Sequence, residues 1–265
     1  QFRNESKTTK DSVEKKLRID RDWILNKNEF YAHGEIIDTS DTDTLYRNIF
    51  DPTKFTGTIF SESLKKYGTQ VKTISKKKMP YENYKNINSH TSKPLLHSAI
   101  NLMNESDNLT AELFVKSIGA LDTLPGSWET GLDSIKTFLA RQVLIDTANV
   151  RLADGSGVSR YNLTSSAQLN SLLSWMYKSE YKDDFLSTLP GGGFKNSTLD
   201  KRLIDEGGLV RAKTGGLTGV RNLAGYIISR KYGDVAFSIL MNGYTDSSSR
   251  YARIHDQIIK AIIYD

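Results

Sequence analysis

The chain has 265 residues, of which 38% are hydrophobic and 25% are charged, and it carries a formal net charge of +5. This composition is typical of a globular protein that is long enough to bury a sizeable core, and no apolar run approaches the roughly 18 residues that a membrane-spanning helix needs. The sequence contains no cysteine, which excludes disulfides, thiolate metal sites and a cysteine nucleophile.

The N-terminal third shows few regular patterns. Alternating charged and apolar positions predict strands over residues 16–25 and 30–37. A helix is predicted from Pro52 to a stop at Gly68, and a further strand over residues 69–74. Residues 76–93 form a polar connector rich in lysine and asparagine, which is the expected internal boundary.

The middle of the chain has helical periodicity. Four segments place apolar residues three and four positions apart or begin with helix-capping residues, and Gly119 is expected to end the second of them. The predicted helices are residues 94–104, 106–119, 127–144 and 164–179.

The C-terminal third changes to the period of a strand. Short strands are predicted over residues 209–215, 222–229 and 234–243, and their glycine-containing connections favour an antiparallel meander. Residues 247–265 are then predicted to form an amphipathic helix capped by serine. Its apolar face is a wide stripe of isoleucines, and His255 lies where this stripe would continue toward the N-terminus. The expected fold class is therefore α+β, an antiparallel sheet flanked by helices.

Metal and nucleic-acid functions receive little support. The four histidines (His33, His90, His97 and His255) lack the spacing of metal ligands, and neither a metal site nor another cofactor is expected. The net positive charge is mild, and the run Lys76–Lys78 is typical of a solvated loop. A nucleic-acid partner is therefore not expected.

The segment Gly207–Ile227, "GGLVRAKTGGLTGVRNLAGYI", places a lysine and a threonine before two glycines at the end of a predicted strand. Glycine weakens strands, so either the hairpin contains a bulge or a ligand approaches the backbone closely. Far upstream, Ser106-Asp107-Asn108 opens a predicted helix. The tripeptides S-D-N and K-T-G, with S-x-x-K, form the signature of penicillin-binding proteins and class A β-lactamases.

Plainer interpretations exist for each motif. Ser106 and Asp107 have the residue types of a helix cap, and Lys213 could be an exposed strand residue followed by a turn. Capping does not account for the lysine-threonine-glycine run, however, so the ordered pair of motifs favours a catalytic site.

Three further stretches are similar to one family. Residues 152–166, "LADGSGVSRYNLTSS", together with residues 49–68 and 213–227, resemble segments of the D-Ala-D-Ala carboxypeptidase/endopeptidase family that includes penicillin-binding protein 4. The resemblance covers about residues 20–265 and implies a β-lactamase/transpeptidase-like fold. It makes residues 41–265 the C-terminal part of the penicillin-binding domain, and residues 1–40 the remnant or exit of an inserted domain.

The resemblance also implies acyl transfer at a serine. Ser106 would relay a proton toward the leaving amine, Asn108 would hold the substrate amide, and Lys213 would supply positive potential. Thr214 would bind the terminal carboxylate, and Gly215 and Gly216 would let the substrate lie against the strand as an added strand. The N–H of Gly216 would be one oxyanion donor.

Two features depart from the family pattern. Gly216 stands where the family usually has threonine, so a contact to the substrate carboxylate is lost. None of the four S-x-x-K matches, which begin at Ser12, Ser63, Ser75 and Ser179, has the apolar context of a nucleophile. We therefore expect the nucleophile on an N-terminal segment absent from this chain, and an exposed apolar face near residues 106–114 that this segment fills.

Two function hypotheses follow. The first is a periplasmic or otherwise extracytoplasmic serine-type D-Ala-D-Ala carboxypeptidase/endopeptidase, with peptidoglycan stem peptides as substrates and β-lactams as covalent inhibitors. The alternative is a non-catalytic homologue that binds cell-wall peptides. A nucleic-acid-binding domain would rest on charge alone.

Overall fold

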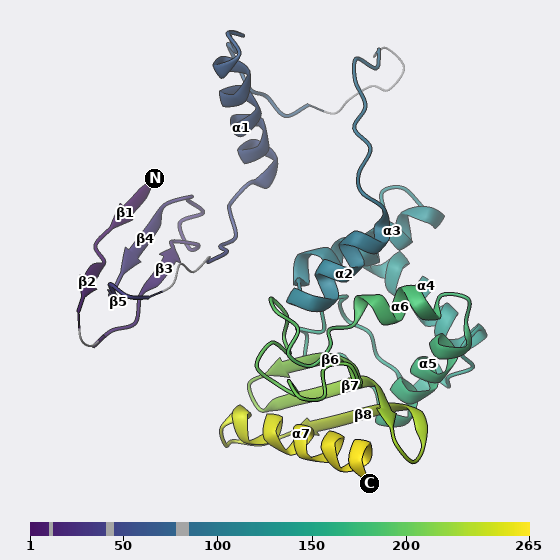
Figure 1. The fold of residues 1–265 in the computed structure, drawn as a ribbon. Coiled ribbons are helices and arrows are strands. Elements are labelled where there is room, and N and C mark those ends of the chain that lie inside the picture. The colour runs from purple at the N-terminus through teal and green to yellow at the C-terminus, as the bar shows by residue number, and fades with distance from the viewer. Residues whose placement is uncertain (11–12, 41–44, 78–84) are drawn as a thin grey trace. The chain divides into compact units, whose positions relative to one another are not determined.

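A computed structural model describes four stretches of the chain, residues 1–10, 13–40, 45–77 and 85–265 (Figure 1). The chain divides into two compact units, Gln1–Ser89 and His90–Asp265. The division lies within the polar connector predicted over residues 76–93. The assignment of residues 1–40 to an inserted domain stays a prediction. Among the described residues, no helix has both the length and the apolar character to cross a membrane.

The first unit begins with five short strands, whose pairing is mostly between distant segments. In one sheet β4 (Phe30–His33) lies between β1 (Phe2–Asn4), which is parallel to it, and β3 (Arg18–Arg21), which is antiparallel to it. In the other, β2 (Lys7–Thr9) pairs parallel with β5 (Glu35–Ile37). Strands were predicted at the positions of β3, β4 and β5, whereas the polar β1 and β2 were not. The prediction over residues 16–25 was too long, because the chain turns after β3 and leaves an exposed apolar run at 23–25.

Helix α1 (Pro52–Lys66) confirms the helix predicted after Asp51. The Asp51 side chain caps it by accepting a hydrogen bond of 3.0 Å from the backbone N–H of Lys54. The strand predicted over residues 69–74 was wrong, because this segment pairs with no described strand. Ile74 instead lies against α1, with a side-chain atom 2.9 Å from the position that a Cβ on Gly57 would occupy.

The second unit consists of helices and one three-stranded sheet. The four predicted helices are present, together with the short α6, which was not predicted. Their bounds are α2 (Leu95–Glu105), α3 (Asn108–Asp122), α4 (Trp128–Arg141), α5 (Ser166–Lys178) and α6 (Lys182–Thr188). Gly119 does not end α3 as predicted. A Cβ at this position would lie 2.4 Å from Oγ1 of Thr130, so the glycine lets α4 pack closely against α3.

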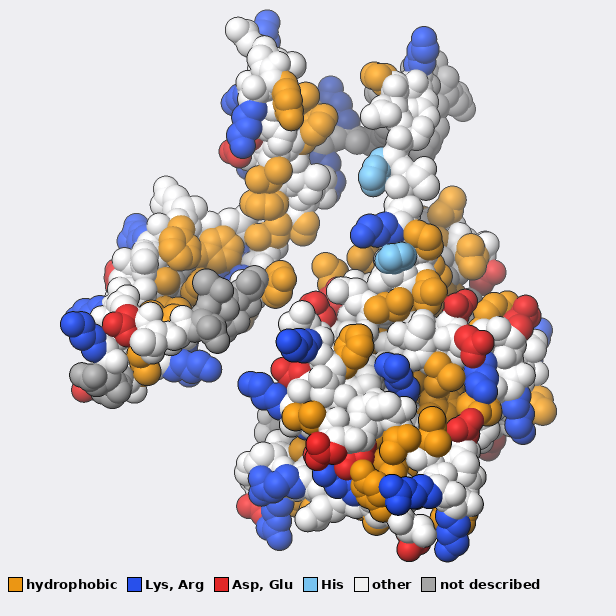
Figure 2. Space-filling model, viewed as in Figure 1, with side chains coloured by type: hydrophobic (Ala, Val, Ile, Leu, Met, Phe, Trp, Pro, Cys, Tyr) orange, Lys and Arg blue, Asp and Glu red, His pale blue; other side chains and the backbone are white. Residues whose placement is uncertain are grey.

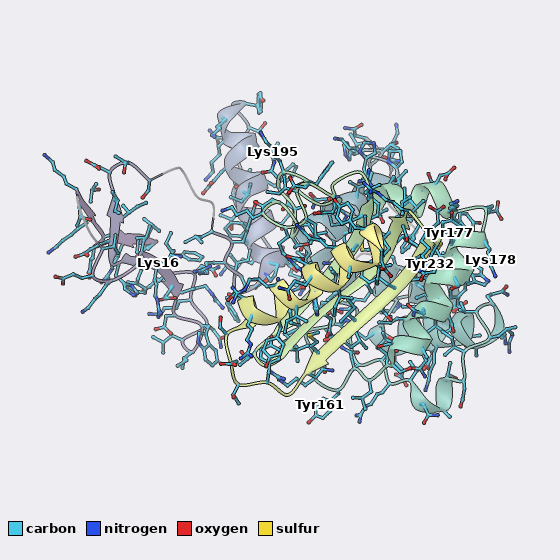
Figure 3. The ribbon with its side chains drawn as sticks, turned by 60° about the horizontal axis from the view of Figure 1, so that its bottom comes forward. Lys16, Tyr161, Tyr177, Lys178, Lys195 and Tyr232 are labelled. Carbon is cyan, nitrogen blue, oxygen red and sulfur yellow. The ribbon has the colours of Figure 1, made fainter. Side chains whose placement is uncertain are left out.

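The sheet of the second unit is the predicted antiparallel meander. Strands β6 (Val210–Leu217), β7 (Val220–Ser229) and β8 (Gly233–Asn242) lie side by side in that order. Helix α7 (Ser248–Tyr264) covers one face of this sheet and runs alongside the strands in Figure 3, while α5 and α6 pack on the other face.

Alternate residues of β7 enter two different cores. Leu223 and Ile227 pack with Ile259 and Ile263 of α7, whereas Tyr226 packs with Leu173 of α5. Because side chains alternate along a strand, this division identifies the face of every residue on β6 and β7. Ser247 is at the predicted N-cap of α7, although its side chain forms no capping hydrogen bond there.

Candidate active site

The turn between α2 and α3 presents a serine hydroxyl. Ser106 ends α2 in the left-handed conformation, with φ 60° and ψ 50°, and its N–H donates to the carbonyl of Leu102. Asp107 then caps α3, since its carboxylate accepts a hydrogen bond of 3.0 Å from the N–H of Leu109. The capping interpretation is therefore correct for Asp107. It does not apply to Ser106, whose side chain points elsewhere.

The hydroxyl of Ser106 accepts a hydrogen bond of 2.8 Å from the Nζ of Lys213 on β6. The predicted closeness of these two residues is confirmed. Lys213 lies on the face of β6 away from α7, because its neighbour Ala212 packs into the core beneath α7. Lys213 is half-buried rather than an exposed strand residue.

The environment of Lys213 perturbs its titration. Burial lowers the pKa of its ammonium group from 10.5 to about 8. The same Nζ also donates to the carbonyl oxygen of Thr214 at 3.1 Å. Near pH 7 the group is still predominantly a cation, so it can place positive charge beside the Ser106 hydroxyl and donate to it.

Strand β6 has an open edge next to this pair. The register of β6 with β7 is continuous from Val210 to Leu217, which excludes a bulge. At the outer side, the N–H of Ala212 donates to the carbonyl of Pro190, and no described strand pairs with β6 there. Because N–H directions alternate along a strand, the N–H groups of Thr214 and Gly216 point to the same outer side. This edge can accept an extended peptide as an added strand.

The two glycines after Thr214 are not required by packing. A Cβ on Gly215 would be 3.5 Å from the nearest atom, an ordinary contact, and one on Gly216 would be 3.4 Å from Nη1 of Arg221. Gly225 on the neighbouring strand differs, because a Cβ there would be 2.1 Å from the carbonyl oxygen of Arg211. Gly225 is thus needed by the fold, whereas Gly215 and Gly216 leave the strand edge free for another molecule.

Asn108 is the first residue of α3 and is exposed. It lies two residues beyond Ser106, so the SDN motif spans the whole turn between the helices. Its side chain has no hydrogen bond to the described residues that would hold it in the fold. The roles of Asn108 and of the other five predicted site residues stay predictions.

The DGSG segment connects α3 with the β6–β7 turn. Asp154 folds the segment by accepting hydrogen bonds from the N–H groups of Gly157 (2.8 Å) and Ser159 (2.6 Å). Arg160 then reaches the turn, where its Nη2 donates to the carbonyl of Thr218 at 2.6 Å. This segment therefore holds the end of β6 in place relative to the helices.

Glu112, which was not predicted as a site residue, anchors that segment. Its carboxylate accepts hydrogen bonds from the N–H groups of Gly155 (3.1 Å) and Ser156 (3.0 Å) and from Nε1 of Trp128 (2.7 Å). Burial alone would raise the pKa of Glu112, but a hydrogen bond from the Ser156 side chain, together with those from the two N–H groups and Trp128, outweighs burial and lowers it. A single acidic residue within the apolar run of α3 was the available signal.

The S-x-x-K matches do not supply a serine opposite Lys213 in the described part of the second unit. The hydroxyl of Ser179 donates to the carbonyl of Met176 at 2.8 Å, and the Nζ of Lys182 lies over the ring of Tyr177. Ser63 is an exposed residue of α1 in the first unit. Ser12 and Lys78, which belong to the remaining two matches, lie outside the described residues.

The surface of α3 has the exposed apolar side chains that were expected. Leu109 is 67% exposed and Leu113, one turn later, is 52% exposed. On the face of the second unit that Figure 2 shows, lysine and arginine side chains are dispersed among carboxylates. A dispersed distribution differs from the concentrated basic surface of many nucleic-acid-binding domains.

The fold is that of penicillin-binding proteins. The chain superimposes on penicillin binding protein 4 (dacB) from Haemophilus influenzae with a TM-score of 0.76 and 24% identity, covering 100% of this chain and 60% of that one. A penicillin G acylated endopeptidase from Bdellovibrio bacteriovorus gives a TM-score of 0.55 and 21% identity, covering 81% of this chain and 60% of that one.

Sequence comparison gives the family. Residues 1–261 match the model of the D-Ala-D-Ala carboxypeptidase 3 (S13) family, and the chain belongs to this family. A D-alanyl-D-alanine carboxypeptidase from Actinomadura is 32% identical over 238 residues, which are 86% of this chain and 44% of that enzyme. The chain therefore spans less than half the length of this relative.

Proposed function

We propose that this chain forms part of a serine-type D-Ala-D-Ala carboxypeptidase/endopeptidase that acts on peptidoglycan stem peptides outside the cytoplasm. The observation that carries this proposal is the hydrogen bond of 2.8 Å from Lys213 to Ser106, beside the open edge of β6. Family membership and the names of the relatives, which are carboxypeptidases, point in the same direction.

Ser106 and Lys213 act together in this proposal. When the peptide bond breaks, the leaving amine needs a proton, and the Ser106 hydroxyl can pass one on. The Lys213 ammonium donates to that hydroxyl, so its charge stabilises the negative charge that develops as the acyl-enzyme forms. The left-handed backbone at Ser106 fixes the direction of its Cα–Cβ bond in the turn between the two helices.

The substrate peptide lies along β6 in the same proposal. Outward N–H groups at Thr214 and Gly216 can bind its backbone, and the Gly216 N–H is one donor to the oxyanion. Asn108, exposed at the start of α3, holds the substrate amide. The Thr214 hydroxyl binds the terminal carboxylate, and the absence of side chains at 215 and 216 lets the peptide approach.

The nucleophilic serine comes from a segment outside these 265 residues. Ser179 is engaged with Met176, and the chain aligns with only 44% of the Actinomadura relative. The exposed Leu109 and Leu113 provide an apolar surface beside the SDN turn on which such a segment would pack. β-Lactams would acylate that serine, in the way that penicillin G acylates the Bdellovibrio endopeptidase.

Acylation of the full-length gene product tests the proposal. The protein is incubated with a labelled penicillin, and the mass increase and its rate are measured for the wild type and for Lys213→Ala. We expect covalent labelling of the wild type and a loss of about 10²–10³-fold in rate for the variant, as for removal of an oxyanion donor. Lys195→Ala is the matched control, because Lys195 is an exposed lysine at the surface of the same unit (Figure 3).

The outcomes separate the enzyme from the alternative function. A wild type that binds D-Ala-D-Ala peptides without ever becoming acylated is a non-catalytic cell-wall peptide-binding homologue. Equal acylation rates for the wild type and Lys213→Ala would show that Lys213 has no role in acylation.

A further inference from the structure

Gly216 has no side chain, and Arg221 borders the space that a side chain there would occupy. Gly216 pairs with Arg221 in the register of β6 and β7, so side chains at these two positions lie on the same face of the sheet. The nearest atom to a Cβ built on Gly216 is Nη1 of Arg221, at 3.4 Å. The guanidinium group therefore stands beside the place where a threonine side chain would be.

No carboxylate of the described residues lies within ion-pair distance of Arg221, and the nearby Asp256 is paired with Arg202. The Nε of Arg221 is buried and has no hydrogen-bond partner among the described residues. Its neighbour Arg202 differs, because Nη2 of Arg202 binds the carboxylate of Asp256 at 2.7 Å. Burial, followed by the nearby charge of Arg202, lowers the pKa of the Arg221 guanidinium, and the smaller effects of Tyr244 and Asp256 oppose this shift. A half-buried cation of this kind is costly unless an anion binds to it.

The position of Arg221 matches that of a carboxylate-binding group. Thr214 alternates with Lys213 along β6, so its side chain lies on the same face as position 216 and Arg221. A terminal carboxylate held by the Thr214 hydroxyl is thus on the side of the strand from which the Arg221 guanidinium can reach it. The planar donors of arginine suit two carboxylate oxygens at once.

We propose that Arg221 binds the terminal carboxylate of the substrate peptide together with Thr214, in place of a side chain at residue 216. This inference rests on the proposed function, because it takes a D-Ala-D-Ala peptide on β6 as the ligand. It makes Arg221 a residue that determines specificity for a free C-terminal carboxylate over a C-terminal amide.

The test compares two ligands that differ only in the terminal charge. An uncleavable D-Ala-D-Ala isostere, with a CH2–CH2 unit in place of the scissile amide, is prepared with a free carboxylate and with a carboxamide. Dissociation constants for both are measured by calorimetry with the full-length gene product. We expect Arg221→Ala to weaken binding of the acid by about 10- to 100-fold, as for a hydrogen bond to a charged group, and to leave binding of the amide nearly unchanged.

Three further variants make the result specific. Arg221→Lys should retain part of the preference, since it keeps the charge but not the two-pronged geometry. Arg221→Ala combined with Gly216→Thr should regain part of it, because the threonine hydroxyl would then face the carboxylate. Arg253→Ala, which removes an exposed arginine of α7, should leave both affinities unchanged. Thermal unfolding of each variant checks that it is folded.

Each result bears on the role of Arg221. An equal loss for acid and amide would make Arg221 a purely structural residue, and an unchanged acid affinity in a folded Arg221→Ala protein would overturn the inference outright. Acylation by labelled penicillin is measured on the same samples. If the wild type prefers the acid through Arg221 but is not acylated, the enzyme proposal fails while the carboxylate site stands.

Discussion

The Nζ of Lys213 and the Oγ of Ser106 are joined by a hydrogen bond of 2.8 Å, although the two residues are 107 positions apart in the chain. One end of this contact is a half-buried strand residue, and the other is a single left-handed residue between two helices. The backbone of each residue is placed by its own element, the strand β6 or the turn between α2 and α3. The contact is therefore a product of the tertiary structure that mutations can separate from the stability of the fold.

The backbone at Ser106 makes the first prediction possible. A left-handed conformation costs a residue with a Cβ about 1–2 kcal/mol, which glycine avoids. We expect Ser106→Gly to have a free energy of unfolding about 1 kcal/mol higher than Ser106→Ala, measured by denaturant titration. Both variants lack the hydroxyl, so both should be acylated slowly by penicillin. Acylation at the wild-type rate in either variant would show that Ser106 relays no proton.

The pKa of Lys213 gives the second prediction. Burial lowers this pKa to about 8, so the ammonium group loses its proton as the pH rises through that value. Because the proposed role needs the cation, the rate constant of acylation should fall between pH 7 and pH 10. Lys213→Arg should be slower at pH 7 but should show no fall with its midpoint near pH 8, since guanidinium stays charged. Parallel pH profiles for the two proteins would contradict the assignment.

Gly225 is required by the fold, whereas we expect Gly215 to be required by the ligand. Gly225→Ala would place a Cβ 2.1 Å from the carbonyl oxygen of Arg211, so we expect a loss of about 3 kcal/mol or more in the free energy of unfolding. Gly215→Ala meets its nearest atom at 3.5 Å and should change stability by less than about 0.5 kcal/mol. It should nevertheless weaken binding of a D-Ala-D-Ala peptide, because the new methyl group stands where the peptide approaches. Unfolding and binding titrations are carried out on both variants. A Gly215→Ala protein that loses stability but binds the peptide as the wild type does would contradict the prediction.

His255 of α7 predicts how stability depends on pH. The imidazole is fully buried and neither ring nitrogen has a hydrogen-bond partner among the described residues. Burial, followed by the charges of Arg202 and Arg221, lowers its pKa to about 4, and Asp256 opposes this shift only weakly. In the unfolded chain the imidazole takes up a proton at its usual pKa near 6.5. The stability from neutral His255 is therefore present above about pH 6.5 and is lost as the pH falls toward about 4, by up to about 3 kcal/mol.

Replacing this histidine should remove that part of the pH dependence. We expect the free energy of unfolding of His255→Leu to fall less steeply than that of the wild type between pH 6.5 and pH 4, in denaturant titrations at several pH values. His97→Leu, at an exposed position of α2, is the matched control and should keep the wild-type slope. A wild-type slope in His255→Leu as well would mean that other groups cause the acid sensitivity.

Local patterns in the sequence were sufficient for the elements that build the second unit. The helices α2 to α5, the meander β6–β7–β8 and the amphipathic α7 follow from apolar periodicity, capping residues and glycine-containing turns, all of which act within a few residues. The SDN and KTG motifs were also visible, because a short motif keeps its residues adjacent. Local signals were insufficient in the first unit, where parallel pairs such as β1–β4 depend on distant segments and where residues 69–74 find no partner strand among the described residues.

Only the tertiary structure decided what surrounds those motifs. The register of two strands places Arg221 beside Gly216, and the close packing of α3 brings Glu112 to the DGSG segment. The local sequence does not identify the partner of either residue, because each contact depends on which faces of distant elements meet. The sequence by itself determined the elements and the residues that carry the chemistry. The packing of the sheet against the helices determined that Ser106 meets Lys213, and that the edge of β6 next to them stays open, since a hydrogen bond or a strand edge exists only once its distant partners have been placed.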